Sequence, residues 1–248
     1  MFMLSTTTKQ EASLTQDTIS IGGHGQAKEI IGRFLRNKAA VFGLAIVVFL
    51  LFCAIFPQAL TQYDPIEQDL RNRFAAPSSE HYFGTDEYGR DIFARVIYGC
   101  RTSMEIGLIS VAVSCIIGVI IGAVAGFYGG ITDNLFMRFI DILMAIPNTL
   151  LGISIVAALG NSIPNLIIAL SIGSIAGYAR VVRVSVLSTK GMEYVEAAYA
   201  TGASDARIIF KYILPNCLAP IIVQATMSVA TTIMTATGLS FLGLGVPA

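Results

Sequence analysis

The sequence contains few charged residues and no tryptophan. Only 13% of its 248 residues are charged, whereas 54% are hydrophobic. An ordinary soluble domain carries about twice that share of charge, so the composition favours lipid as the solvent. Lysine plus arginine balance aspartate plus glutamate, and this zero net charge argues against a nucleic-acid partner. Without tryptophan, tyrosine and phenylalanine must serve as the aromatic anchors at a membrane surface.

Sequence patterns for catalysis and metal binding are also missing. The chain contains no H-E-x-x-H, no G-x-S-x-G and no G-x-x-x-x-G-K-[ST]. Without a phosphate-binding loop it is not expected to hydrolyse ATP by the usual route. We therefore predict no enzymatic activity, no bound cofactor and no metal site. The cysteines form no C-x-x-C pair and are interpreted as small hydrophobic residues (Cys53, Cys100, Cys115 and Cys217).

Five apolar runs have roughly the 20 residues that a bilayer requires. They are expected at residues 39–56, 103–128, 136–159, 163–182 and 217–237. The fold class predicted from them is all-α, a polytopic membrane helical bundle. The first run is interpreted as an uncleaved span, because no small-residue cleavage site follows it before Pro57.

The chain is divided accordingly into four parts. These are a mobile cytoplasmic tail (1–28), a basic flank with the first span (29–56), an extracytoplasmic loop (57–102) and a core (103–248). Within the loop, the pattern from Ile92 is amphipathic and predicts an interfacial helix that leads into the second span. A short loop with Asp133 and Arg138 is expected between the second and third spans.

Lysine and arginine predict the orientation of the chain. Eleven of them lie on the side that holds the N-terminus and the polar segment of residues 193–215, and five lie in the 57–102 loop. Because the side richer in these residues is usually cytoplasmic, the N-terminus is predicted in the cytoplasm.

A few residues within the spans are candidates for packing or for transport. Gly118, Gly122 and Gly126 recur every fourth residue and predict close helix packing. Asp141 is interpreted as the partner of Arg138 three residues away, with a substrate-path role as the alternative. Pro147-Asn148 predicts either a plain kink or backbone opened toward a pore.

The polar loop contains a second candidate group. Asp86, Arg90 and Asp91 are interpreted as a structural network, with contact to an external protein as the alternative, and His81 as a structural residue.

A polar, alanine-rich hairpin interrupts the apolar runs. It reads EYVEAAYATGASDARIIFKYILP, from Glu193 to Pro215. Glu193 and Glu196 suit the start of a helix, Gly202 allows a turn at positive φ, and Ser204 or Asp205 can cap a second helix. Pro215 is expected to end that helix. The pattern predicts a slim knob that a partner outside the membrane grips.

The knob resembles a known family pattern. Glu196-Ala197-Ala198, Gly202 and Leu214-Pro215 are similar to the EAA loop of ABC importer permeases. That resemblance implies that the loop docks onto a cytoplasmic ATPase. The family often has isoleucine where Tyr212 stands here.

Other stretches resemble one subgroup of that family. FGTDEYGRDIFARVIYGCRTSMEIG, RFIDILMAIPNTLL and the ending SFLGLGVP are similar to the C-type permease of the dipeptide and oligopeptide subgroup. The resemblance implies a type I permease fold in the cytoplasmic (inner) membrane. It also implies a homologous second permease, two ATPases that use ATP and magnesium, and an extracytoplasmic solute-binding protein. Members usually continue past the FLGLG segment, so the last family span is expected to be missing.

The sequence is compatible with two other functions. Import of nickel or another small solute is an alternative, because related importers share these motifs. A membrane scaffold or channel subunit without an ATPase is an alternative of another class.

Overall fold

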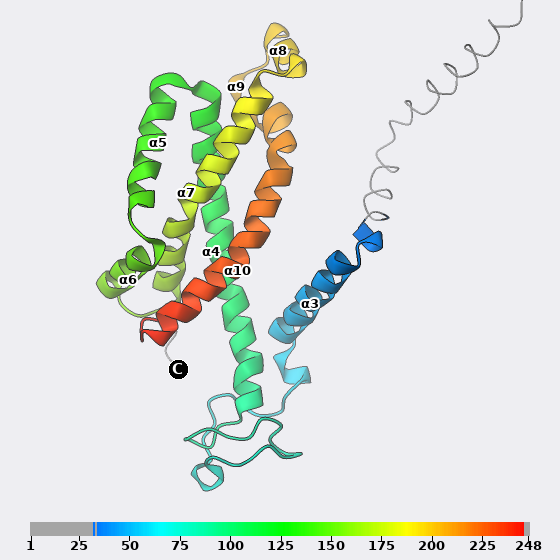
Figure 1. The fold of residues 1–248 in the computed structure, drawn as a ribbon, viewed down its shortest axis with the longest axis vertical. Coiled ribbons are helices and arrows are strands. Elements are labelled where there is room, and N and C mark those ends of the chain that lie inside the picture. Colours follow the sequence, from blue (N-terminus) through cyan, green and yellow to red (C-terminus); the bar gives the residue numbers. More distant parts are fainter. Residues whose placement is uncertain (1–31, 33, 246–248) are drawn as a thin grey trace, which may run out of the picture. The chain divides into compact units, whose positions relative to one another are not determined.

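The computed structural model describes residue 32 and residues 34–245, and these residues are mostly helical (Figure 1). The tail predicted over residues 1–28 lies outside them. Within the described residues no strand forms beyond an isolated bridge between Thr85 and Asp91. This confirms the all-helical prediction. The chain divides into two units, residues 1–55 and residues 56–248.

The first unit contains the helix α3, Lys38–Ile55. Its 18 residues are apolar enough to cross a membrane. The side chain of Asn37 accepts hydrogen bonds from the backbone N–H groups of Ala39 and Ala40, at 3.1 and 3.3 Å. These bonds satisfy N–H groups that have no partner within a helix.

The second unit begins with the short 3-10 turns η1 (Pro57–Ala59) and η2 (Leu70–Asn72) in a polar loop. The helices that follow are α4 (Ile92–Tyr128), α5 (Gly130–Ala145), α6 (Asn148–Leu159), α7 (Ile163–Lys190), α8 (Glu193–Ala200), α9 (Asp205–Arg207) and α10 (Leu218–Phe241). With α3, four helical segments of the described residues could each cross a membrane, or five if the bent pair α5 and α6 counts as one span. The predicted polytopic bundle is therefore confirmed.

Two predicted boundaries were wrong. The segment from Ile92 is helical as predicted, but it continues unbroken into the span as the first part of the 37-residue α4, so the loop predicted over residues 57–102 ends at Asp91. Asp91 caps α4, since its carboxylate accepts a hydrogen bond from Ala94 N at 2.7 Å. Asp133 and Arg138 lie in α5 rather than in a loop.

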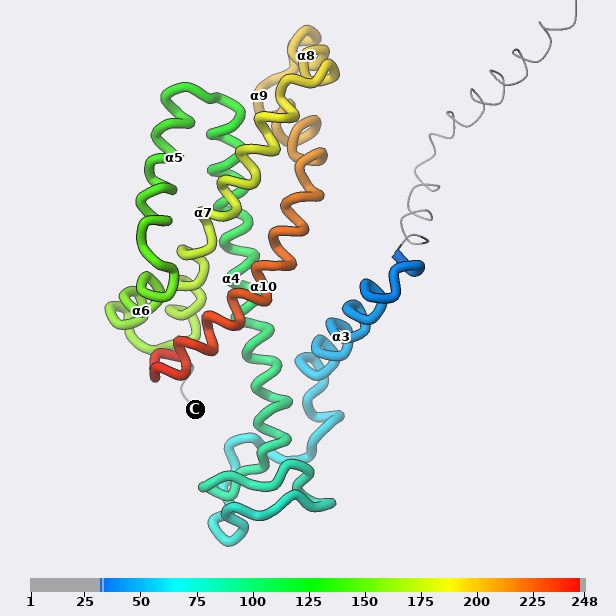
Figure 2. The backbone as a smooth tube through the Cα atoms, in the orientation of Figure 1, coloured from blue at the N-terminus to red at the C-terminus, as the bar shows by residue number. Residues whose placement is uncertain are grey.

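The helices α4 and α7 form the most extensive contact of the second unit, and they run side by side in Figure 2. The three glycines spaced by four on α4 face α7. A Cβ atom would lie 2.4 Å from Tyr178 Cβ at Gly118, 2.5 Å from the Ala179 oxygen at Gly122 and 3.0 Å from the Arg183 oxygen at Gly126. Only glycine allows the two backbones to approach this closely.

The third predicted span is not one straight helix. The helices α5 and α6 meet at an angle of 86° at Ile146-Pro147. Proline has no N–H group and disfavours a helical residue before it, and Ile146 is indeed extended with ψ 124°.

Pro215 does not end a helix, contrary to our prediction. Helical backbone continues from Asp205 to Phe241, with a π-helical stretch η3 at Ile208–Ile213 and a 3-10 turn η4 at Leu214–Cys217. In the wider π turn, Leu214 N donates to Ile209 O, five residues back. The side chain of Asn216 donates to Tyr212 O at 2.7 Å. These bonds help the backbone to pass the proline without a break.

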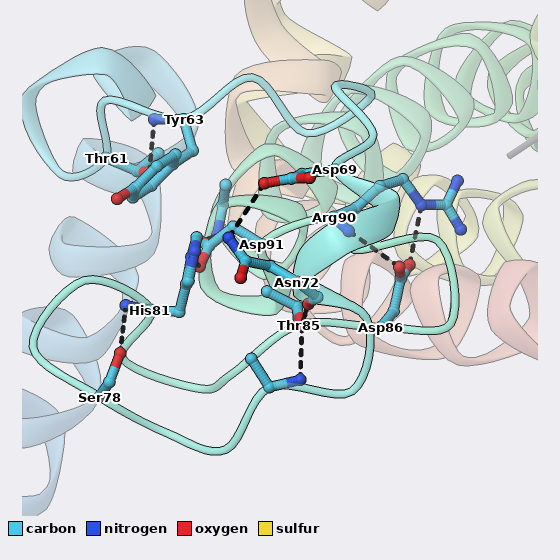
Figure 3. Close-up of polar contacts among 12 residues, drawn as sticks. Thr61, Tyr63, Asp69, Asn72, Ser78, His81, Thr85, Asp86, Arg90 and Asp91 are labelled. Atoms are coloured by element: carbon cyan, nitrogen blue, oxygen red, sulfur yellow. Dashed lines mark hydrogen bonds and ion pairs between the residues drawn. The ribbon is translucent and has the colours of Figure 1, made fainter.

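The polar loop before α4 is held by ion pairs (Figure 3). The carboxylate of Asp86 accepts hydrogen bonds from Arg90 Nε at 2.8 Å and Arg95 Nη1 at 2.5 Å. His81 Nδ1 lies 3.0 Å from Asp91 Oδ1. These residues thus form the structural network that the first interpretation favoured.

Candidate functional site

The hairpin around Glu196 protrudes at one end of the second unit, and the polar loop of residues 57–91 lies at the opposite end (Figure 1). Glu193 and Glu196 both lie in the first turn of α8, where negative charge favours the helix dipole. The side chains of Tyr194, Glu196 and Tyr199 are exposed. The knob therefore presents an acidic and aromatic surface.

The inner face of α8 anchors the knob to the spans. Val195 and Ala198, three residues apart, are buried in one apolar cluster together with Phe127 of α4 and Val186 of α7. The same cluster includes Ile208, Ile209, Ile213, Cys217 and Ile221 of the following helical run. A force on the knob would therefore reach α4, α7 and α10 through packed side chains.

Aromatic and polar contacts add to this anchor. The ring of Tyr199 stacks on that of Phe127, with centroids 6.2 Å apart. Lys190 Nζ donates to Phe127 O at 2.5 Å. Burial, together with the charge of Asp205, raises the pKa of the Tyr199 hydroxyl. Tyr199 thus remains an uncharged hydrogen-bonding group at neutral pH.

Gly202 forms the turn of the hairpin. Its φ of +76° lies in the left-handed region, as its sequence position predicted. Ser204 occupies the N-cap position of α9, although its side chain makes no capping hydrogen bond. No heavy atom would lie within 4 Å of a Cβ atom at Gly202, so only the backbone conformation requires glycine there.

The six predicted coupling residues differ in exposure. Glu196, Ala197, Gly202 and Pro215 are exposed, whereas Ala198 is buried and Leu214 packs on the apolar cluster. The first group can contact a partner, and the second holds the knob in place.

A polar groove forms beside the break between α5 and α6. It has a volume of about 360 Å³ and lies between that break, α7 and α10. Its lining residues are Met144, Ile146, Pro147, Asn148, Gly173, Ser174, Ala176, Gly177, Gln224, Ser228 and Thr231. A hollow of about 70 Å³ shares Asn148 and Ser174 with it and adds Thr235.

The three candidates for a translocation path do not all lie together. Pro147 and Asn148 line the groove, but Asp141 does not. The Asp141 carboxylate accepts a hydrogen bond from Arg180 Nη2 at 2.6 Å, and both side chains are about half exposed. The predicted pairing with Arg138 was therefore wrong, since α7 brings Arg180 within reach.

Sequence reasoning missed Ser174, Gln224, Ser228 and Thr231 as lining residues. Gln224 and Ser228 are spaced by four on α10, and this polar face within an apolar run was the signal available. Among the described residues, no three histidine, cysteine, aspartate or glutamate side chains gather as a metal site would require.

Two family models match the chain. Residues 118–248 match the binding-protein-dependent transport system inner membrane component, and residues 25–77 match the N-terminal membrane domain of oligopeptide transport permease C.

Curated relatives are similar over most of the chain. A dipeptide transport system permease protein of Alkalihalophilus pseudofirmus is 45% identical over 89% of this chain and 73% of its own. An oligopeptide transport system permease protein of Bacillus subtilis is 43% identical over 89% of this chain and 72% of its own. A di/tripeptide transport system permease protein of Pseudomonas aeruginosa is 42% identical over 88% and 74% respectively.

Proposed function

The chain belongs to the family of binding-protein-dependent transport system inner membrane components, and we propose that it imports dipeptides and oligopeptides. It is a multi-pass membrane subunit of an ABC importer and not itself the enzyme of that machine. The three relatives reported above are named as dipeptide, oligopeptide and di/tripeptide permeases, and these names support this choice of substrate.

The proposed complex contains several other subunits. A homologous second permease lines the pathway together with this chain, and two cytoplasmic ATPases hydrolyse ATP with magnesium. A solute-binding protein delivers the peptide to the extracytoplasmic side, where residues 57–91 lie. The N-terminus and the knob of residues 193–215 face the cytoplasm, in the cytoplasmic (inner) membrane. This orientation is supported by the excess of lysine and arginine on that side.

One observation carries the proposed mechanism: an exposed acidic helix is anchored by buried residues to three spans. Closure of the ATPase pair on ATP would move α8, and Val195 and Ala198 would transmit that movement to α4, α7 and α10. Packed interfaces shift between discrete arrangements rather than deform gradually, so a small movement at the knob can tilt whole helices.

Removing the charge of Glu196 tests the proposed coupling to the ATPase. We expect Glu196→Gln to lower peptide uptake and uptake per ATP hydrolysed at least about fivefold, because an interfacial charge pair contributes ~1 kcal/mol or more. The amount of the subunit in the membrane should not change, since Glu196 is exposed. Both quantities are measured on the complete importer in proteoliposomes.

Glu193 provides a matched control. It is an exposed acid in the same helical turn but outside the family motif, and Glu193→Gln should transport at the wild-type rate. Unchanged uptake and coupling in Glu196→Gln would contradict the coupling role.

A further inference from the structure

We propose that the polar groove beside the α5–α6 break binds the backbone of a peptide in transit through uncharged amide and hydroxyl groups. The inference rests on the proposed function, peptide import, and adds the residues and the chemistry that the peptide meets. The groove brings together the α5–α6 break, the following helix α7 and the more distant α10.

The polar groups of the groove are all neutral. None of its lining residues is ionisable, and the polar side chains come from different walls. Asn148 lies at the start of α6, Ser174 on α7 and Gln224, Ser228 and Thr231 on α10. A groove within membrane helices that is polar yet uncharged is suited to a ligand that is itself polar and largely uncharged.

The hydrogen bonds of these side chains leave capacity for a ligand. Ser174 Oγ donates to Leu170 O at 3.1 Å and Thr231 Oγ1 to Ser228 O at 3.1 Å, so both hydroxyl oxygens can still accept. The amide of Gln224 makes one long contact, 3.5 Å to Ser228 Oγ. Among the described residues no hydrogen bond involves the Asn148 side chain, so both amides can donate and accept.

These groups match the repeating unit of a peptide. Each peptide bond offers one N–H donor and one carbonyl acceptor. Hydroxyl and side-chain amide oxygens of the groove can accept a hydrogen bond from the peptide N–H. The side-chain amide N–H groups can donate one to the peptide carbonyl. Since no charged side chain lines the groove, neither a cationic nor an anionic side chain of the peptide meets an ion-pair partner or a like charge there. Neutral bonds are also about half as strong as charge-assisted ones, which favours release after passage.

Two glycines of α7 leave room for the backbone of the ligand. A Cβ atom at Gly173 would lie 3.6 Å from the Asn148 side chain, and one at Gly177 would lie 3.5 Å from Gln224 Nε2. The absence of side chains at these two positions keeps Asn148 and Gln224 accessible. In addition, the first turn of α6 has N–H groups without helical partners, and membrane proteins tolerate such groups beside a hydrated cavity.

Peptide uptake by the complete importer in proteoliposomes tests the proposal, with Ala-Lys-Ala and Ala-Glu-Ala as probes. The wild type should import both at similar rates. Gln224→Glu should raise the Lys-to-Glu uptake ratio about tenfold, because a single charge in a partly desolvated groove separates the two peptides strongly. Asn148→Asp, on another wall, should change the ratio in the same direction, and Gln224→Lys in the opposite one.

A matched control comes from Asn134, an exposed residue of α5 outside the groove. Asn134→Asp makes the same amide-to-acid change and should keep the wild-type ratio. Gln224→Met removes the amide but adds no charge, so uptake of both probes should fall by a common factor. All rates are divided by the amount of assembled importer.

The outcomes separate this inference from the proposed function. If the wild type imports both peptides but Gln224→Glu, Gln224→Lys and Asn148→Asp keep its ratio, the groove does not bind the peptide. If the wild type imports neither peptide, peptide import is itself wrong and the inference fails with it. Uptake of Ni²⁺ by the same proteoliposomes would then support the small-solute alternative.

Discussion

At the scale of single residues, the absence of a side chain is as informative as any functional group. Gly118, Gly122 and Gly126 bring the backbones of α4 and α7 together. The α8 helix of the knob packs against residues of these same two helices. In lipid, apolar side chains gain little by leaving their solvent, so close packing must hold two helices together. Hydroxyl groups extend the same interface, since Ser114 Oγ donates to Ser171 O across it at 3.0 Å.

Gly122 allows a stability prediction. A Cβ atom there would lie 2.5 Å from a backbone oxygen of α7, so Gly122→Ala should force the helices apart and cost ~1–3 kcal/mol. Gly99, on the same helix, has no heavy atom within 4 Å of its Cβ position, so Gly99→Ala should be neutral or slightly stabilising. Thermal unfolding in detergent compares the two variants. Equal midpoints would show that the close approach is not required.

At the scale of elements, the loop before α4 is a structured unit rather than a mere connection. Burial would raise the pKa of the Asp86 carboxyl, but backbone N–H groups of Arg90 and Tyr88 and the side chains of Arg90 and Arg95 hold it well below its usual range. A carboxylate with a lowered pKa stabilises the fold at every pH above its ordinary value. That stabilisation is lost as the pH falls through the lowered value.

The loop should therefore lose protection only in acid. We expect the protection factors of residues 69–91, which are the intrinsic exchange rates divided by the observed ones, to be constant from pH 8 to about 5 and to fall below about pH 4, where Asp86 begins to take up a proton in the unfolded loop. Asp86→Asn should exchange faster already at neutral pH and lose most of this acid dependence. Asp64→Asn, at an exposed turn where Asp64 accepts from Ile66 N at 2.8 Å, serves as the control. Acid dependence in Asp86→Asn equal to that of the wild type would disprove the role of Asp86.

At the scale of the whole molecule, the second unit has two functional ends. The loop of residues 57–91 and the knob lie at opposite ends of α4 (Figure 1). An importer needs this separation, because substrate arrives on one side of the membrane and ATP is hydrolysed on the other. The groove lies away from the knob, beside the break between α5 and α6, so in the proposed mechanism the knob acts on it through the packed helices.

Cysteine labelling tests this orientation. Ser204→Cys, exposed beside the knob's turn, should react with an impermeant maleimide in inverted vesicles but not in intact cells. Ser79→Cys, exposed in the loop, should show the opposite pattern. The wild type measures the background from its natural cysteines. Labelling of Ser204→Cys in intact cells would reverse the proposed topology.

Local signals explain what could be predicted. Apolar runs of membrane length predicted the spans, and the spacing of glycine predicted the face of α4 that meets α7. The hairpin was found because an alanine-rich polar segment with a glycine contrasts with its apolar neighbours. The continuation of the helix past Pro215 was not predictable from local signals. It depends on a π turn, and that turn depends on how Ile208 and Ile213 pack in the buried cluster.

The sequence by itself determined that the chain lies in lipid, where its spans approximately lie, which family it resembles and which residues form the surface of the knob. Hydropathy, charge and motif are properties of neighbouring residues, so a short stretch of sequence is enough to show them. Only the tertiary structure decided which distant residues meet. It paired Asp141 with Arg180, bent the third span by 86° and placed Asn148 and Gln224 in the lining of one groove. The physical reason is that such contacts depend on the crossing of α5, α6, α7 and α10, and no short stretch of sequence records how helices cross.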